Sequence, residues 1–349
     1  IFNRYALSVS VRADGSSLVG ENHTWGLFPS VSGEWDVKHE AFLRGVDAVN
    51  RLKFRIGYGE SGNLAGISAY NAVRRMVPTN VVPVNGAPVV TMSEARNYNP
   101  DLRWETRGTF NVGAEAALWD NRLILTVAYY HAVTRDMLYE YEVPVPPFVY
   151  NKLLANNGTL SNDGWELGLG ASLLRTRDWG LDANANLTVQ RSRLRSLGGA
   201  CLGMQLTASR ITPIGGMELG AGFHGGNNNV LYQIVGQPLG VFYLPKSTGL
   251  ELQPDGSRRY EIEDLDHNGR INVEDGGDRY VAGQATPKVM LGSNIAVRYK
   301  NWDLTMQING AFGHKIFNAT ALAYMNMTSF PDYNVMRGAP QQNIKDQNV

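Results

Sequence analysis

Apolar and polar residues alternate one for one along most of this chain of 349 residues. An amphipathic helix would instead repeat its apolar residues at every third or fourth position. Successive side chains of a β-strand point to opposite faces of the sheet, so the pattern predicts strands with one apolar and one polar face. About nine such strands are predicted. They begin near Tyr5, Trp25, Arg51, Arg103, Leu123, Trp165, Leu181, Val289 and Trp302.

The predicted strands are long. Several run for about 11 to 13 residues, whereas strands of soluble folds average five or six. At about 3.3 Å per residue and a tilt near 40°, such a strand just crosses a hydrocarbon layer about 25 to 30 Å thick. The apolar faces carry no Asp, Glu, Lys or Arg, and the opposite faces carry the charged residues of the strands. The sequence therefore predicts an all-β fold, as part of a large antiparallel transmembrane β-barrel with a wet lumen.

The connections between the predicted strands alternate between short and long. Tight ones fall at 118–121, 176–178 and 300–301, and long ones at about 61–101, 134–163, 191–286 and 314–349. Outer-membrane barrels combine short periplasmic turns with long extracellular loops in this way. The tryptophans are predicted to lie near strand ends as an aromatic girdle, the alternative being core residues of a soluble sandwich. They are Trp25, Trp35, Trp104, Trp119, Trp165, Trp179 and Trp302.

The strand faces give a specific topology. We expect one set of leucines to face lipid and one set of charged residues to face the lumen, because a register slip of one residue would turn every charge outward. The lipid-facing set is Leu125, Leu169, Leu187, Leu291 and Leu304. The lumen-facing set is Arg107, Glu166, Asp182 and Asp303.

Composition excludes several classes of protein. The formal net charge is zero, so the chain lacks the basic excess of a nucleic-acid binder. The single cysteine, Cys201, excludes a disulfide framework and is predicted to be a small buried or loop thiol. No apolar run reaches the roughly 18 residues of a membrane helix. The chain opens at Ile1 without a signal peptide, so it is expected to be a piece of a longer protein.

Several segments, in this order, resemble the barrel of the SusC/RagA-like TonB-dependent transporters. They are Arg12–Ser17, Trp25–Ser32, Leu52–Asn63, Asn99–Thr106, Asn121–Leu123 with Tyr129-Tyr130, and Asn162–Leu167. The resemblance implies energised import of an oligosaccharide or oligopeptide across a Gram-negative outer membrane, without covalent chemistry. It further implies a SusD-like surface lipoprotein as partner, and TonB acting through an N-terminal part that this sequence lacks. The chain is also expected to lack the family's plug and its last strands, because about nine predicted strands are well short of the 22 in plugged transporters.

One segment matches a calcium-binding loop. Oxygen ligands are expected at positions 1, 3, 5, 7, 9 and 12, and Gly269 at position 6 permits the sharp turn. The candidate ligands are Asp264, Asp266, Asn268, the Arg270 carbonyl, Asn272 and Asp275. The all-oxygen set disfavours zinc and copper. We expect the loop to bind Ca²⁺ in preference to Mg²⁺, although the short side chain of Asp275 makes bidentate contact with the ion less favourable. The alternative is a solvated turn.

Other motifs do not support an enzyme. Gly220–Gly225 matches G-x-G-x-x-G, but a Gly-Asn-Asn-Asn run replaces the helix that a nucleotide site needs. The histidines are dispersed and form no zinc pair, and Ser61 misses the G-x-S-x-G elbow. Two other classes of function remain alternatives: a soluble or surface calcium-binding β-sandwich adhesion module, and an outer-membrane hydrolase.

Loop aromatics are the remaining candidates for substrate contact. They are Tyr139, Tyr141, Phe148 and Tyr150 around Pro144–Pro147, with Phe242 and Tyr243. Such rings could stack on a sugar or contact a peptide. The alternatives are packing within the loops and contact with the lipoprotein.

Overall fold

The computed structural model describes residues 4–207, 211–213, 230–273, 276–328, 330–331 and 334–346. The chain forms two compact units. The first comprises Ile1–Ala208 with Val289–Ala311, and the second Ser209–Lys288 with Phe312–Val349. Among the described residues, no helix combines the length and the apolar character needed to cross a membrane.

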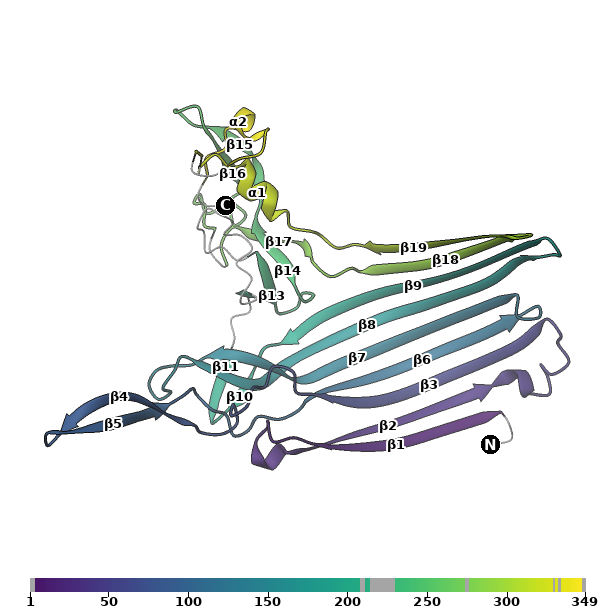
Figure 1. Cartoon of the computed structure of the whole chain (residues 1–349), viewed down its shortest axis with the longest axis horizontal. Coiled ribbons are helices and arrows are strands. Elements are labelled where there is room, and N and C mark those ends of the chain that lie inside the picture. Colours follow the sequence, from purple (N-terminus) through teal and green to yellow (C-terminus); the bar gives the residue numbers. More distant parts are fainter. Residues whose placement is uncertain are drawn as a thin grey trace. The chain divides into compact units, whose positions relative to one another are not determined.

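The first unit is built on one sheet of nine strands, whose order is β1-β2-β3-β6-β7-β8-β9-β18-β19. Figure 1 shows these strands side by side in chain order. The pairings from β1 through β18 are antiparallel. The strands are β1 Tyr5–Gly15, β2 Trp25–Asp36, β3 Val49–Asn63, β6 Glu105–Leu118, β7 Leu123–Glu142, β8 Lys152–Arg175, β9 Trp179–Ser196, β18 Val289–Tyr299 and β19 Trp302–Phe312.

The register of the sheet separates the two predicted sets of residues. Leu125 lies opposite Leu169, and Leu187 lies opposite Leu291. Residues directly opposite each other in an antiparallel pair share a face. Glu166 lies opposite Thr188, so it is on the other face from these leucines. By the same pairings, Arg107, Asp182 and Arg55 are on the face of Glu166. The two-faced alternation predicted from the sequence is confirmed.

The apolar face has no protein layer over it within the described part of the first unit. Leu7 is 70% exposed and Leu27 66%, on the first two strands. At the other edge of the sheet, Leu304 of β19 is 63% exposed. Gly292 and Asn309 face each other on the polar side, which puts Leu304 on the apolar face and Asp303 on the polar face.

The tight connections lie where they were predicted. Strands β6 and β7 are joined through Trp119, Asp120 and Asn121, all three with positive φ. β8 ends at Arg175 and β9 begins at Trp179, and β18 and β19 are separated by residues 300–301. We call the end of the strands at which these tight turns lie the turn end, and the opposite end of the same strands the loop end.

The predicted loop at 134–163 requires correction. β7 continues to Glu142 and β8 begins at Lys152, so the connection is confined to 143–151. A β-bulge between Thr134 and Met137, with Asp136 at φ 54°, interrupts the period-two alternation that marked the strand in the sequence. As a consequence of the longer β8, Trp165 lies inside a strand, whereas it was predicted at a strand end.

The loop end of the first unit carries two hairpins and two apolar clusters. β4 (Met76–Val84) and β5 (Ala87–Glu94) meet at Asn85-Gly86, both with positive φ, as a tight hairpin turn requires. β10 (Gly198–Cys201) pairs with β11 (Met204–Thr207). One cluster of buried residues centres on Tyr141, Leu153 and Cys201, and another on Val19, Ile67 and Leu102. At the loop end, beyond the part of the sheet with one apolar and one polar face, side chains are therefore packed into buried clusters.

The second unit occupies most of the predicted 191–286 and 314–349 loops, and the described residues of these segments contain strands and helices. It contains a sheet of order β12-β13-β14-β17 and a hairpin, β15-β16. Its core is formed by Tyr232, Val241 and Tyr243. The elements are β12 Ile211–Pro213, β13 Leu231–Ile234, β14 Val241–Pro245, β15 Ser247–Leu252, β16 Arg258–Ile262, β17 Arg279–Gln284, α1 Ala319–Met325 and α2 Ala339–Gln342.

Candidate functional site

The polar face of the sheet carries a row of alternating charges across β2, β3 and β6. Glu34 accepts from Lys53 at 2.6 Å and from Arg55 at 3.1 Å. Glu115 accepts from Arg55 at 2.8 Å and from Arg51 at 2.7 Å. Because the side chains sit directly across or diagonal to one another in the ladder, the sheet register itself holds the pairs together.

A shallow pocket of about 540 Å³ continues this row across β6, β7 and β8. Arg55, Arg107, Asn111, Tyr130 and Glu166 line it. The ring of Tyr130 lies against Gly164, where a Cβ atom would come within 2.5 Å of the ring. The face therefore offers hydrogen-bond donors, acceptors and one flat aromatic surface to a polar solute.

At the loop end, buried asparagines attach the segment before β6 to β8. Asn156 accepts from the Arg103 backbone N–H at 3.0 Å and donates to the carbonyls of Arg103 at 2.8 Å and Asp136 at 2.9 Å. Asn99 donates to the Leu154 carbonyl at 3.0 Å, and Asn97 donates to that of Lys152 at 2.8 Å. The sequence analysis assigned no role to these three side chains, although Asn99 is the first residue of the Asn99–Thr106 segment that resembles the family.

A second pocket, of about 290 Å³, opens beside these asparagines. Its walls include His23, Asp101, Arg103, Asn157 and Cys201. Cys201 is 9% exposed and packs with the Tyr141 cluster. Burial raises the pKa of the Cys201 thiol, and the nearby Asp101 carboxylate adds to the effect. The prediction of a small buried or loop thiol is confirmed by its burial.

The loop aromatics pack into cores. Tyr141 is 2% exposed, and Tyr139 and Phe148 pack against its cluster. In the second unit, Phe242 and Tyr243 are also buried. Tyr150 is the exception: it is exposed, and its hydroxyl donates to the Glu94 carbonyl at 2.7 Å. Packing of the loops, the alternative considered for these rings, accounts for the buried ones.

The acidic loop of the second unit follows β16. Asp264 accepts from the backbone N–H groups of Asn268 at 3.2 Å and Gly269 at 2.7 Å. Asp266 accepts from the Asn268 backbone N–H at 3.0 Å, and Asn268 accepts from that of Arg270 at 2.8 Å. The spacing predicted for positions 1, 3 and 5 thus produces one tight curl of chain.

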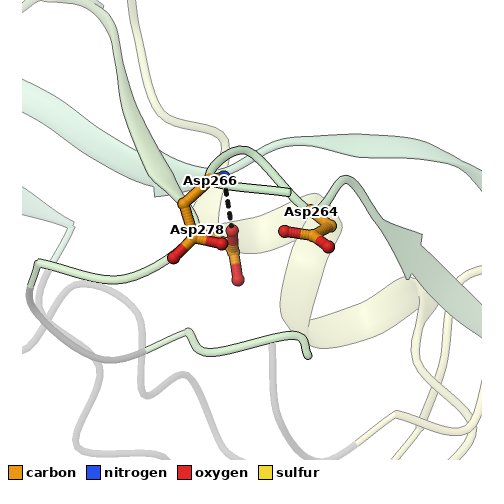
Figure 2. A group of neighbouring side chains, drawn as sticks. All are labelled: Asp264, Asp266 and Asp278. Atoms are coloured by element: carbon orange, nitrogen blue, oxygen red, sulfur yellow. Dashed lines mark hydrogen bonds between the residues drawn. The ribbon is translucent and has the colours of Figure 1, made fainter. Parts of the chain in front are cut away.

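Asp278 completes the group of acids in this loop. One carboxylate oxygen each of Asp264, Asp266 and Asp278 lies within 4.8 Å of the others. Asp278 is fully buried and accepts from the N–H groups of Leu265 at 2.7 Å and Asn272 at 2.8 Å. Figure 2 shows the three side chains grouped at the bend, with the bond from the Asp266 N–H to Asp278. Such a group of hard oxygens is suited to a divalent cation.

Backbone hydrogen bonds favour the ionised form of two of these carboxyls, Asp264 and Asp278. The bond from the Gly269 N–H is the main cause that lowers the pKa of Asp264 below its ordinary value. The pKa of Asp278 is lowered mainly by the bond from the Asn272 N–H. Both groups therefore stay charged at neutral pH.

Asp278 was not among the predicted ligands. The chain turns back at Gly276 and Gly277, and a Cβ on Gly277 would lie 2.3 Å from the Asn272 carbonyl oxygen. This turn carries Asp278 to the bend, three positions after the expected twelfth ligand. The predicted ligand Asp275 and the Gly220–Gly225 motif lie outside the described residues.

Comparison with known proteins decides the family. A model of the family described as "TonB dependent receptor-like, beta-barrel" matches residues 1–310. The chain belongs to this family. The resemblance to its SusC/RagA-like members, and the barrel fold that it implied, are thereby confirmed.

Relatives from two bacteria match most of the chain. It is 27% identical over 327 residues to TonB-dependent receptor P26 of Formosa agariphila, covering 90% of this chain and 31% of the relative. It is 25% identical over 319 residues to TonB-dependent receptor SusC of Bacteroides thetaiotaomicron, covering 91% and 30%. Among solved structures, the RagAB peptide transporter superposes on 98% of this chain and 36% of its own, with 21% identity and a TM-score of 0.73. The chain therefore spans about a third of the length of these relatives.

Family membership decides between the classes considered from the sequence. TonB-dependent receptors are outer-membrane transport proteins of Gram-negative bacteria and are not enzymes. The β-sandwich adhesion module is therefore set aside, and the apolar face of the sheet corresponds to the outer surface of a membrane barrel.

Proposed function

We propose that this chain forms part of the wall of a TonB-dependent importer that takes up an oligosaccharide or an oligopeptide. The observation that carries the proposal is the family match over residues 1–310. The polar face is compatible with it, because a solute moving along the row of Glu34, Arg55 and Glu115 would find paired charges and no strong field of one sign.

Both substrate classes are polar chains that hydrogen-bond along their length. The structural neighbour RagAB is described as a peptide importer, which supports the peptide alternative. The exposed donors and acceptors around Asn111 and Tyr130 would serve hydroxyl groups equally well. We further propose that a SusD-like surface lipoprotein captures the substrate and that TonB supplies the energy.

Uptake by whole cells tests this function. Cells that produce the intact transporter and its lipoprotein partner would receive mixed fluorescent oligosaccharides or mixed oligopeptides. We expect accumulation of one class, lost when the transporter gene, the partner gene or TonB is deleted and when the proton gradient is collapsed. Accumulation that survives loss of TonB would contradict energised import, and a lack of uptake of both classes would contradict the proposed substrates.

We also propose that the acidic loop binds a divalent cation, calcium in preference to magnesium. The convergence of Asp264, Asp266 and Asp278 supports this, because three carboxylates within 4.8 Å repel one another unless a cation lies between them. Asn268, the Arg270 carbonyl and Asn272 would complete an oxygen shell, as expected from their spacing, with Asp275 as a further candidate. The cation would order the loop and would have no catalytic role.

Calorimetric titration of the chelator-treated intact transporter with Ca²⁺ and Mg²⁺ tests the cation site. We expect Asp264→Asn with Asp266→Asn to abolish binding. The matched control is Asp255→Asn, since Asp255 lies in the turn between β15 and β16 and bonds only locally to Ser257. Binding that survives the double substitution, or that is lost equally in the control, would show that the loop is only a turn.

A further inference from the structure

The apolar face of β9 becomes strongly basic near the loop end. Leu187 and Val189 on this face are followed by Arg191, Arg193 and Arg195, which we call the arginine row. All three arginines are exposed, whereas Leu194 between them points to the other face and is fully buried. The row therefore lies on the outside of the barrel wall, on the same face as the lipid-facing leucines.

The arginine row begins where the apolar band ends. Val189 lies opposite Trp165, whose ring centroid is 5.0 Å from that of Tyr129 in the next strand, with the two rings tilted by 49°. From Leu181 to Val189 this face of β9 carries no charge. Nine residues at about 3.3 Å and a tilt near 40° span about 23 Å, close to the roughly 25 Å band of such barrels. Arg191 follows at the position immediately beyond, which is the headgroup level at the loop end.

The charges around the arginine row offset it only in part. One acid, Asp163, lies directly opposite Arg191 and contacts His131, so a single carboxylate faces three arginines. Arg195 donates to the hydroxyl of Ser161 at 2.8 Å, which leaves its charge uncompensated. Within the described part of the chain, neither Arg191 nor Arg193 forms an ion pair. Successive arginines are about 6.6 Å apart along the strand, so neighbouring guanidinium groups can address one multivalent anion.

We propose that the arginine row binds the phosphate groups of an outer-leaflet glycolipid, whose acyl chains lie along the apolar face below it. Guanidinium groups bind phosphate bidentately, and basic residues next to a membrane gain most from anionic headgroups. Three exposed arginines at the headgroup level would bind such a phosphorylated headgroup more tightly than the headgroup of a neutral lipid. The inference rests on the outer-membrane placement of the barrel and not on which substrate is imported, so the two can fail separately.

Lipid binding to the intact transporter in non-ionic detergent tests the proposal. The probes are diphosphorylated lipid A and the same lipid with both phosphates removed, and native mass spectrometry measures the bound fraction of each. We expect the unaltered protein to bind the phosphorylated lipid about tenfold more tightly or better, and high salt to reduce the difference. The triple variant Arg191→Gln/Arg193→Gln/Arg195→Gln is expected to bind both lipids alike.

The matched control removes arginines from the opposite end of the sheet. Arg175 and Arg177 are also exposed but lie at the β8–β9 turn, so Arg175→Gln/Arg177→Gln should keep the preference for phosphate. Heat-modifiability in gel electrophoresis verifies that each barrel is folded. If the triple variant fails to fold, the double variant Arg191→Gln/Arg193→Gln is tested in its place, because it retains the Arg195–Ser161 bond. Equal binding of both lipids by the unaltered protein, or an unchanged preference in the folded variant, overturns the proposal.

Discussion

At the scale of single residues, Asp278 organises the acidic loop. It lies immediately before β17, and its two carboxylate oxygens reach the backbone on both sides of the curl, at Leu265 and at Asn272. A buried carboxylate in this position exchanges water for N–H donors, which favour its charged form. Backbone N–H groups therefore take the place of a basic side chain as partners of Asp278, while the repulsion among the three carboxylates is left for the proposed cation to offset.

The lowered pKa values of Asp264 and Asp278 predict how the loop responds to pH. A carboxyl with a pKa below its unfolded value of about 3.9 adds stability above that pH, and the contribution is lost as the pH falls through the lower, folded value. In chelator, we expect amide exchange at Leu265, Gly269 and Asn272, corrected for intrinsic rates, to be constant from about pH 8 to 5 and to accelerate below about pH 4. Asp278→Asn should abolish most of this pH dependence. Protection that varies between pH 8 and 5 would contradict it.

Asn156 gives a prediction on stability at the loop end. It is 4% exposed, and Asn156→Ala would leave the Arg103 N–H and two carbonyls without their partner. We expect a loss of about 2 to 4 kcal/mol in the free energy of unfolding, measured by urea titration of the intact barrel in liposomes. The neighbouring Asn157 has a buried amide nitrogen without a hydrogen-bond partner among the described residues. Asn157→Ala should thus be close to neutral, and equal losses in the two variants would refute the role of Asn156.

At the scale of elements, alternation in the sequence predicts the strands well wherever one face is apolar and the ladder is regular. It fails at the bulge of Asp136, beyond which β7 continues for six more residues to Glu142. Three consecutive polar residues, Thr134, Arg135 and Asp136, break the period-two signal there, although Tyr141 and Glu142 again alternate between buried and exposed. The short strands of the second unit, such as β14, were missed for a different reason: Val241, Phe242 and Tyr243 are consecutive and all buried, so they show no alternation.

The acidic loop shows the same limit for the candidate site. The local spacing of Asp264, Asp266 and Asn268 predicts a curl because each side chain bonds to a backbone group two to five residues away. Asp278 arrives through a turn at Gly276–Gly277 that no ligand pattern includes. The asparagines at 97, 99 and 156 bond to segments more than 50 residues away, a separation at which one sequence contains no pairing signal.

The two faces of β9 provide a matched pair of substitutions. Ala185 lies midway along the charge-free stretch from Leu181 to Val189, and Asn184 is next to it on the polar face. We expect Ala185→Arg to destabilise the barrel in liposomes by about 2 to 4 kcal/mol, because the guanidinium would face the middle of the hydrocarbon. Asn184→Arg adds the same side chain to the lumen and should cost much less. Equal costs in urea titrations would contradict the assigned faces.

At the scale of the whole molecule, exposed apolar residues on one face of a nine-stranded sheet predict how the intact protein behaves in water. Leu7, Leu27 and Leu304 belong to a surface that far exceeds the few hundred Å² of apolar patch found on soluble monomers. We expect the intact transporter to be monodisperse in non-ionic detergent and to aggregate when the detergent is removed, as followed by light scattering. Transfer into liposomes before removal should prevent aggregation, because lipid then covers this face. A transporter that stayed monodisperse in water without either would show that another protein layer covers the apolar face.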